Sequence, residues 1–531
     1  MAIELGLFAK TALASRTSDT PFHWKYSPIS QGGYPLAVLA AAHACPSGII
    51  ANENSHRFTE WAKKYGPVFP LRIGRHGLMV VLTSAYHATQ ILDKRSANSS
   101  NRPPSFVLGD LVFAGDHPMF MDANERWKLR RKLYFQLMNE TRCNTEHIRL
   151  VEAEATHLLR DLCLEPDSFM HHPARYSNSI IMSLVFGIRT PHYSSPHCIE
   201  LHRIVTELSC LGEIGASPPV DWLPFLKYLP ERLWGNWKTR AARLRQRVLD
   251  LHSPLVDRVL ERRKNIGTAA TFLDGVLDQQ DKLQLTREEI DIMCGNLLEG
   301  GTDTMATTIL TFFQAMVTYP EAQTKAQKEI DSVLTDGECP SWSDYDRLPY
   351  VAMIVKEVLR WRPPAPGSFP HTLAQDDEFE GMKFLKGTSV VLNVWGIHND
   401  ASRYPSPETF EPSRFEGQTR LASVYANAGD AQKRDHFGYG AGRRICPGIH
   451  LAERALFISI AKLLWGFTVQ QKLDGSGNPI PVDVNPATAY RDGFLNQCLP
   501  FDVDIKPRVG KQEMIMITAA KAESYVLSAY S

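Results

Sequence analysis

The strongest constraint on how this chain folds is one long helical pattern, which extends over Leu285–Thr318. Thr286 and Glu289 stand three residues apart at its start, the spacing of a capping box. Gly300 and Gly301 fall at its centre, although each glycine inside a helix costs roughly 1 kcal/mol relative to alanine. Such a costly pair usually has a packing or functional reason, so we expect a close contact or a site there.

The remaining pattern predicts a mainly α fold with minor β content. Predicted helices cover 126–138, 320–334 and 350–361, and strand-like runs cover 78–82, 389–394 and an extended stretch at 494–501. Between Phe58 and Phe501 the sequence shows no repeat, low-complexity tract or long Gly/Ser linker. Strands at both ends of a long run of helices favour one large, helix-dominated α+β domain over several small ones.

Composition and charge exclude several classes of protein. The 531 residues include 58 basic and 58 acidic side chains, and this net charge of zero argues against a polybasic nucleic-acid binder. A hydrophobic fraction of 44% is too high for an intrinsically disordered chain. The 9 cysteines, odd in number and irregularly spaced, do not form a disulfide pattern and fit a reducing, cytosol-facing compartment.

The two ends of the chain differ from the uniform middle. Met1–Ala14 and Tyr34–Ile50 are the candidate membrane segments, but neither has the roughly 20 apolar residues of a spanning helix or the layout of a signal peptide. Either segment could still contact a membrane surface peripherally. We expect a leader over 1–50 without a clear transmembrane helix, one domain over 51–510, and an apolar tail over 511–531.

The most informative segment is 436–454, in which a glycine-rich loop leads to Cys446 at the start of an apolar helix. The glycines do not complete a nucleotide-binding Gly-x-Gly-x-x-Gly motif, because Arg443 occupies the last glycine position. A zinc site is excluded because no second cysteine lies nearby. Helix-start N–H groups, Arg443 and Arg444 would favour the Cys446 thiolate, a soft ligand suited to iron. The alternative is an ordinary buried thiol.

This segment closely resembles the haem-ligand loop of the cytochrome P-450 superfamily. The resemblance implies that Cys446 ligates the iron of haem b (iron protoporphyrin IX), with the long helix crossing the haem and the cysteine loop on its proximal side. Other signature positions near the cofactor are occupied by Gly442, Arg444, Gly448 and Ala452. Tyr439 stands where the family usually has phenylalanine, and its extra hydroxyl needs a partner.

The centre of the long helix matches the family's oxygen-activation motif. By resemblance, a widened turn at Gly300 and Gly301 leaves room beside the haem for dioxygen and water. Thr304 then hydrogen-bonds the distal oxygen and Asp303 relays protons from solvent. Met305 replaces a frequent serine or threonine, so the relay has one hydroxyl fewer.

A structural triad is predicted around the helix at 350–361. Glu357 and Arg360 form a Glu-x-x-Arg pair on one helix face, and Arg414 falls where the family supplies a third, bridging partner. By resemblance this triad is buried and anchors the region that holds the cysteine loop.

Contacts to the haem carboxylates and the substrate are also implied by resemblance. Trp127 and Arg131, four residues apart on one helix, together with His371 and Arg444, are the expected propionate partners. By resemblance, substrate contacts come from the stretches 102–121, roughly 204–223, 296–304, 365–369 and 490–494. These stretches are mainly apolar, which favours a lipophilic molecule. These contacts are Phe113, Leu297, Ala365, Gly367, Ser368, Phe369 and Phe494.

The implied reaction is hydroxylation of a lipophilic molecule with dioxygen, two electrons and two protons. The motifs resemble those of fungal microsomal members, many of which tailor terpenoids, polyketides or alkaloids. No flavin or nicotinamide fingerprint is present, so the resemblance implies a separate NADPH-dependent flavoprotein reductase, or a small haem protein, as electron donor. A basic docking face for it would comprise Arg126, Lys128, Arg130, Lys132, Lys433, Arg434 and Arg443.

The same resemblance implies a monomer on the cytosolic side of the endoplasmic reticulum. Two other functions stay open. A haem-thiolate enzyme could use peroxide or rearrange a substrate without external electrons, although Asp303 and Thr304 favour the monooxygenase. A non-catalytic haem sensor or carrier would give no reason for the costly glycines beside that pair.

Overall fold

The computed structural model describes residues 52–73, 77–212, 216–335, 337–491 and 493–530. The α-helices are α2 (Asn52–Tyr65), α3 (Ala85–Ala88), α4 (Glu125–Met138), α5 (Glu140–Arg142), α6 (Ile148–Leu164), α7 (His172–Phe186), α8 (Pro196–Gly212), α9 (Trp237–Asn265), α10 (Phe272–Leu277), α11 (Gln280–Leu283), α12 (Arg287–Thr318), α13 (Pro320–Val333), α14 (Pro349–Trp361), α15 (Val394–His398), α16 (Ala422–Asn427), α17 (Ile449–Gly466) and α18 (Lys511–Tyr525). The strands are β1 (Val68–Ile73), β2 (Gly77–Leu82), β3 (His371–Thr372), β4 (Asp377–Phe379), β5 (Met382–Phe384), β6 (Ser389–Leu392), β7 (Phe467–Gln470) and β8 (Asp504–Pro507).

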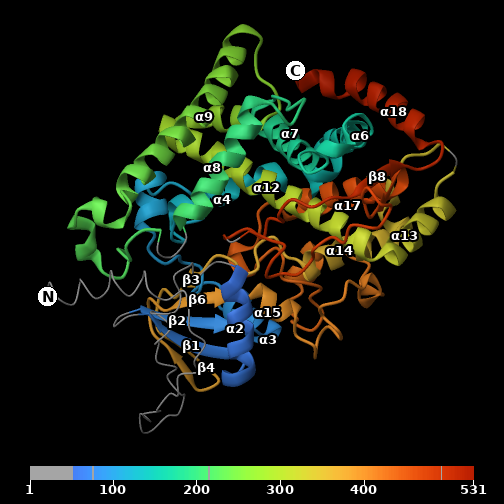
Figure 1. Cartoon of the computed structure of the whole chain (residues 1–531). Helices are drawn as coiled ribbons and strands as arrows, with labels where there is room; N and C mark the ends of the chain where they lie inside the picture. Colours follow the sequence, from blue (N-terminus) through green and yellow to red (C-terminus); the bar gives the residue numbers. More distant parts are fainter. Residues whose placement is uncertain (1–51, 74–76, 213–215, 336, 492, 531) are drawn as a thin grey trace.

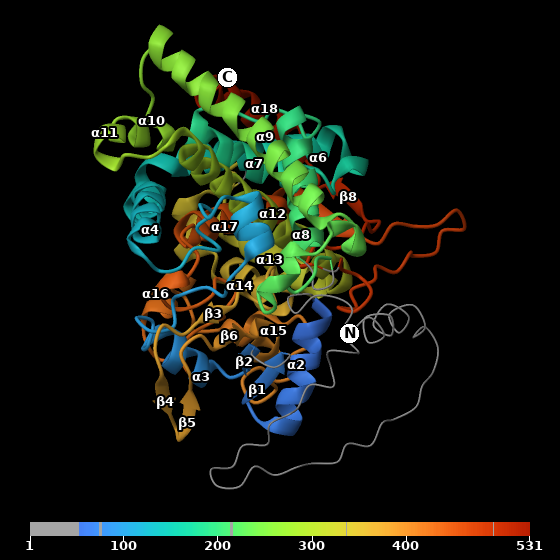
Figure 2. The ribbon, with the colours of Figure 1, turned by 90° about the vertical axis from the view of Figure 1, so that its left-hand side faces the viewer.

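The fold is mainly α with minor β, as the sequence predicts. Long helices gather in one part of the molecule, and the sheet of β1, β2, β6 and β3 lies with α2 in the other (Figures 1 and 2). The largest hydrophobic core is formed by α6, α7, α12, α14 and α17. The predicted helices at 126–138, 320–334 and 350–361 correspond to α4, α13 and α14 within one residue at each end.

The long helix α12 has the predicted capping box, in which Thr286 and Glu289 satisfy each other's backbone N–H groups. Its 32 residues extend about 48 Å through the helical part (Figure 1). At Gly301 an added Cβ would lie only 2.6 Å from Cγ1 of Ile181 on α7. Gly301 therefore allows α7 to pack closely against α12, which is the packing reason expected of this glycine pair.

The extended stretch predicted near 494–501 does not form a strand. This segment holds only an isolated bridge between Tyr490 and Cys498, and the strand β8 begins later, at Asp504. The N–H of Asn496 donates to Pro364 and that of Leu499 donates to Ala489, so the segment bonds to two separate partners. No single neighbouring strand is available to pair with it along its length.

The mixed sheet fixes the position of one predicted site residue, His371. β2 pairs in parallel with β6, while β1 and β3 pair antiparallel at the two sides. His371 in β3 lies opposite Val390 in β6 and is buried. The sheet thereby holds His371 at the boundary with the helical part.

Within the described ranges, every helix is too short or too polar to cross a membrane. The candidate segments Met1–Ala14 and Tyr34–Ile50 lie outside those ranges.

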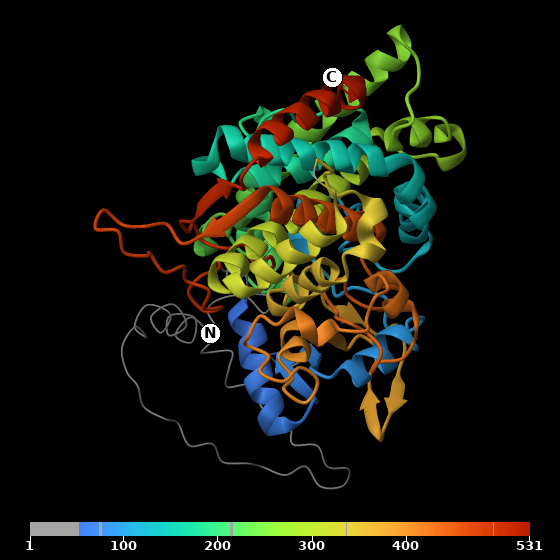
Figure 3. The same cartoon turned by 90° about the vertical axis from the view of Figure 1, so that its right-hand side faces the viewer.

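The C-terminal segment packs on the helical part through α18, which lies beside α6 (Figures 1 and 3). Ile515, Ala519 and Leu527 are buried in this contact. Glu523 forms an ion pair with Arg189 at 2.8 Å, and Arg189 forms a second ion pair with the buried Glu154 at 2.7 Å. The C-terminal residues thus cover a buried charged cluster.

Replacing Leu527 by alanine is expected to lower the free energy of unfolding by about 2–5 kcal/mol, because this fully buried side chain would leave a cavity. The matched control is Tyr525→Ala, since that neighbouring side chain is 84% exposed and its loss should change stability by no more than about 0.5 kcal/mol. Denaturant titration of both variants measures the difference. Equal effects would mean that this end of the chain does not contribute to the core.

Candidate active site

A cavity of about 380 Å³ lies between α12, α17 and the loops that precede α4 and α17. Most of its wall is apolar. The predicted site residues that line it are Trp127, Arg131, Gly300, Gly301, Thr304, His371, Tyr439, Arg444, Cys446, Gly448 and Ala452. The predicted substrate contacts that line it are Phe113, Leu297, Ala365, Ser368, Phe369 and Phe494. The structure therefore brings segments from across the chain to one cavity.

Three predicted residues do not line the cavity: Gly367, Gly442 and Asp303. Gly367 is inside a turn closed by the N–H of Ser368 on the carbonyl of Ala365, and only the ends of this turn reach the cavity. Gly442 has a left-handed φ of +63°, and an added Cβ would lie 2.1 Å from the carbonyl oxygen of Leu92. Gly442 is thus required for packing of the loop against a neighbouring segment and does not face the cavity.

Cys446 lies in the cavity wall three residues before α17, and its N–H donates to the carbonyl of Tyr439 at 2.8 Å. Burial raises the pKa of its thiol, while a hydrogen bond from the Gly448 N–H and the charge of Arg131 act in the opposite direction. Arg443 and Arg444, which were both expected to favour the thiolate, are not among the groups that lower this pKa, and the Arg443 side chain is exposed. Since a coordinating cysteine is deprotonated, a bound metal would have to overcome this raised pKa.

The Tyr439 hydroxyl is buried and, within the described part of the chain, has no hydrogen-bond partner. Its ring lies 5.6 Å from that of His436, measured between centroids. Burial raises the pKa of nearby Glu453 to about 7, and one of its carboxylate oxygens also lacks a partner in the described residues. The departure from phenylalanine therefore adds a buried polar atom behind the cysteine loop.

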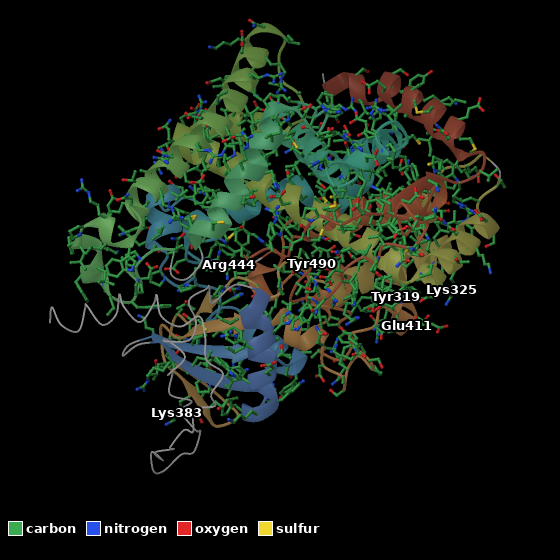
Figure 4. The ribbon with its side chains drawn as sticks, viewed as in Figure 1. Tyr319, Lys325, Lys383, Glu411, Arg444 and Tyr490 are labelled. Carbon is green, nitrogen blue, oxygen red and sulfur yellow. The ribbon has the colours of Figure 1, made fainter. Side chains whose placement is uncertain are left out.

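Three arginines at the cavity share an unusual environment. The guanidinium groups of Arg102, Arg131 and Arg444 donate to backbone carbonyls, and in the described ranges none forms an ion pair with a carboxylate. Burial lowers the pKa of each, that of Arg444 to about 10. Arg444 is labelled in Figure 4 where the helical part meets the sheet. Three half-buried cations without an anion among the described residues fit a ligand that carries carboxylates, and the two propionates of haem meet that need.

The other predicted propionate partners lie beside these arginines. The Arg444 guanidinium lies over the Trp127 ring, 4.2 Å from its centroid. Nδ1 of His371 lies 2.7 Å from the carbonyl of Ser99, so this nitrogen carries the hydrogen. Burial, with a smaller effect of Arg102, lowers the pKa of His371 to about 3. From the sequence, Arg102 was placed only at the start of a substrate-contact stretch and was not assigned to the carboxylates; its only local signal is its place before two prolines.

The predicted triad is present and fully buried at its centre. Glu357 bonds Arg360 through both carboxylate oxygens, at 2.6 and 2.7 Å, and accepts from Nε of Arg414 at 3.0 Å. The carbonyl of Arg360 accepts from Nδ1 of His398, whose Nε2 accepts the N–H of Phe437. One hydrogen-bonded chain therefore links the triad to the segment that leads to Cys446.

The α12 residues of the oxygen-activation motif are arranged differently from the prediction. α12 remains α-helical through Gly300 and Gly301, so the widened turn is not seen in this structure. The hydroxyl of Thr304 donates to the carbonyl of Gly300 at 2.7 Å and lines the cavity. Cβ of an alanine at 300 would meet no atom within 4 Å, so Gly300 leaves open space beside Thr304.

Asp303 points away from the cavity and toward a histidine that the sequence did not single out. Its carboxylate is 3% exposed and lies 3.6 Å from Nδ1 of His202 on α8, which is 52% exposed. Asp303 raises the pKa of His202, mainly by hydrogen bonding. The pair connects a buried carboxylate on α12 with solvent.

The stability contributed by this pair is expected to depend on pH. Because the folded-state pKa of His202 is raised, the contribution is present below the ordinary imidazole pKa of about 6.5 and disappears as pH rises through the raised value. Wild type should therefore unfold at a higher temperature than His202→Gln in acid, and the difference should vanish in alkaline buffer. A difference in unfolding temperature that stays constant across this range would contradict the ion pair.

The predicted basic docking face is only partly on the surface. Arg130 is buried and bonds Asp116 and Glu289, and Arg434 is buried and pairs with Asp93. These two cations are neutralised internally and cannot dock a partner. The exposed members are Arg126, Lys128, Lys132, Lys433 and Arg443.

Comparison with known proteins identifies relatives along the whole chain. The family model for cytochrome P-450 matches residues 35–485. The cytochrome P-450 monooxygenase anuE of Penicillium roqueforti is 87% identical, and the match covers 100% of both chains. The cytochrome P-450 monooxygenase macC of Penicillium terrestre is 46% identical, with 93% of each chain covered.

Solved structures agree on the fold. A zebra fish cytochrome P-450 determined with abiraterone superposes with a TM-score of 0.67 at 23% identity, covering 86% of this chain and 100% of that one. Because the family model and these relatives span nearly the whole sequence, and the cavity holds the cysteine, the chain belongs to the cytochrome P-450 family as a fungal haem monooxygenase of specialised metabolism.

Proposed function

We propose that this enzyme hydroxylates a lipophilic small molecule, using haem b ligated by Cys446 and electrons from NADPH delivered by a flavoprotein reductase. The observation that carries the proposal is the cavity itself, in which Cys446, Thr304 and three half-buried arginines that lack an anionic partner in the described residues share one mostly apolar wall. A terpenoid, polyketide or alkaloid precursor fits such a wall.

The residues that would hold the cofactor are those that the cavity brings together. Cys446 would supply the thiolate, and Arg102, Arg131 and Arg444 would bind the carboxylates, with Trp127 and His371 beside them. Haem, when bound, supplies the activation of dioxygen that no side chain can perform.

The chain's own contribution would be proton delivery and exclusion of water. Thr304 presents a hydroxyl to the cavity, and the open space beside Gly300 would admit a small molecule next to it. Asp303 is buried directly behind this position and is linked to solvent through His202, which would supply protons by exchange between the two. The apolar wall would keep other water away from the reacting atoms.

The electron donor and the cellular location are further parts of the proposal. The exposed basic residues on α4, together with Lys433 and Arg443, would attract an acidic reductase. Leu223, Phe225, Tyr228 and Leu233 are exposed apolar side chains between α8 and α9, which supports a peripheral contact with the endoplasmic reticulum membrane by a monomer. The division into 1–50, 51–510 and 511–531 stays a prediction, with a tail that packs on the domain.

A peroxide-driven or rearranging haem-thiolate enzyme is the second candidate. Such an enzyme needs no proton delivery coupled to external electrons. The Asp303–His202 pair behind Thr304 favours the reductase-dependent reaction over this alternative.

The test is reconstitution of the haem-loaded protein with an NADPH-dependent flavoprotein reductase and isotopically labelled dioxygen. Wild type should incorporate one labelled atom into product, with most NADPH consumption coupled to product. Thr304→Ala should consume NADPH while forming much less product, about tenfold or more below wild type, because proton delivery at this position contributes a factor of that order. Ser is the matched control at position 304, since it keeps the hydroxyl. Product formed equally well from peroxide without reductase would favour the second candidate.

A further inference from the structure

The mostly apolar wall of the cavity contains a cluster of three polar residues that the proposed reaction does not use. His117 lies in the loop before α4, and Asn296 and Glu299 lie three residues apart on one face of α12. Sequence analysis did not single out His117 or Glu299. Each lies in a stretch that was expected to contact the substrate, and the fold shows that the two side chains meet.

Glu299 is a buried carboxylate that is only partly satisfied. Its side chain is 8% exposed, and one oxygen lies 3.1 Å from Nε2 of His117. The other oxygen is buried and has no hydrogen-bond partner in the described ranges. Because a buried acceptor without a donor is unfavourable, the cavity wall here favours a ligand that donates a hydrogen bond.

His117 cannot supply that missing donor, because both its nitrogens are committed. Nδ1 accepts the N–H of Met119 at 3.2 Å, so Nε2 must carry the hydrogen that is donated to Glu299. The ring is held by Phe113, with 4.3 Å between centroids, and is 1% exposed. His117 therefore fixes one oxygen of Glu299 and leaves the other for a ligand.

Asn296 adds a donor to the same place. Its amide lies 2.9 Å from Nε2 of His117. The atom at this contact is the amide nitrogen, Nδ2; because Nε2 of His117 already carries a hydrogen, exchanging the two terminal amide atoms brings the oxygen to it and leaves the two amide hydrogens to donate elsewhere. Glu299 and Asn296 together offer one acceptor and one donor at the cavity wall.

We infer that Glu299 and Asn296 bind a hydroxyl group of the substrate, so that this enzyme selects lipophilic alcohols or phenols. A hydroxyl both donates and accepts, which matches the two side chains, whereas an ether cannot donate and an ammonium group cannot accept. This inference deepens the proposed function and rests on it. His117 is a positioning residue, because it acts through Glu299.

The helix geometry also sets where the substrate is oxidised. Asn296, Gly300 and Thr304 follow one stripe of α12 at four-residue intervals. Thr304 lies five residues beyond Glu299 and eight beyond Asn296, which corresponds to about 8–12 Å along the helix axis. A substrate held by its hydroxyl would therefore be oxidised at a carbon about that far from it.

The binding test compares matched probes by isothermal titration calorimetry of the haem-loaded protein. The probes are straight-chain primary alcohols from decanol to hexadecanol and four-position hexylphenol, each paired with its methyl ether. Wild type should bind each alcohol or phenol about tenfold to a hundredfold more tightly than its ether, the range for a hydrogen bond to a charged group. Glu299→Gln should lower this ratio by about tenfold while leaving ether affinity nearly unchanged.

Two further variants separate recognition from structure. Asn296→Leu should also lower the ratio, because it removes the donor. Met305→Leu, a change in the same wall without a polar group, should alter both affinities together and keep the ratio. A wild-type ratio near one overturns the inference, as does a Glu299→Gln variant that weakens alcohols and ethers equally, since that result assigns Glu299 a structural role only.

The position of oxidation gives an independent readout. As the alcohol chain lengthens, the site of oxidation should remain a fixed number of carbons from the hydroxyl. Oxidation counted from the methyl end instead would overturn the inference while leaving the proposed function intact. Absence of labelled oxygen from every product would reject the proposed function, whereas the calorimetric ratio would still report on the hydroxyl site.

Discussion

Replacing Cys446 by alanine is expected to abolish the thiolate-type absorption of the reduced, carbon monoxide-bound protein and to remove all reductase-dependent hydroxylation. Cys446 is the cysteine that the structure places in the cavity wall, beside Arg131 and the N–H of Gly448. The other described cysteines do not line this cavity. No other described side chain at this position offers a soft anionic ligand, so the loss of activity should exceed a thousandfold rather than a few fold.

The matched control is Cys163→Ala at the end of α6, a half-buried cysteine outside the cavity, which should keep both the spectrum and the activity. Absorption and haem content are measured on the same samples, so loss of ligation is separated from loss of haem. A thiolate-type spectrum that survives in Cys446→Ala would show that another residue ligates the iron.

Local patterns were enough to predict the helices α4, α12, α13 and α14. The capping box at Thr286 and Glu289 and the prolines at 320 and 349 determine where α12, α13 and α14 begin, because these signals act within one turn of the chain. The stretch at 494–501 failed because strand formation depends on a partner. Its N–H groups bond to Pro364 and Ala489, which no local pattern reveals.

The site residues fall into the same two groups, those predicted from local spacing and those that depend on contacts between distant segments. Glu357 and Arg360, or Trp127 and Arg131, are spaced to share a helix face, and both pairs lie where the sequence predicts. Arg102 reaches the carbonyls of Phe369 and Pro370 from the far side of the cavity, and His202 reaches Asp303 from α8. Such contacts join segments distant in sequence, so a single sequence does not indicate them.

The exposure of charged side chains was the property predicted least well from the sequence. Arg130 and Arg434 were assigned to a docking surface because basic residues in loops and on helix faces are usually exposed. Both are buried and paired with acidic residues from other elements. Arg130 pairs with Asp116 and Glu289, and Arg434 pairs with Asp93. The three cavity arginines show the reverse: their charges are half-buried and have no acidic partner in the part of the chain that the structure describes, which points to a ligand.

Replacing Glu357 by glutamine is expected to lower the free energy of unfolding by about 3–5 kcal/mol, because it leaves two arginines without their carboxylate. Arg360 is fully buried, so its charge cannot be solvated. Haem content should fall as well, since Arg360 holds His398, and His398 holds the N–H of Phe437 near the cysteine loop. Denaturant titration and the haem-to-protein ratio measure the two effects.

The control for this variant is Glu411→Gln, three residues before Arg414 and labelled in Figure 4. Its carboxylate is exposed and, among the described residues, accepts only the N–H of Ser413, a bond that the glutamine oxygen can keep. Its stability should change by no more than about 0.5 kcal/mol, with full haem content. If Glu357→Gln lost stability but kept its haem, the triad would stabilise the helical core without holding the cysteine loop. If it lost neither, the hydrogen-bonded chain to Phe437 would not contribute to the free energy of unfolding. Loss of both by Glu357→Gln, with neither lost in the control, is the result that a buried triad linked to the cysteine loop requires.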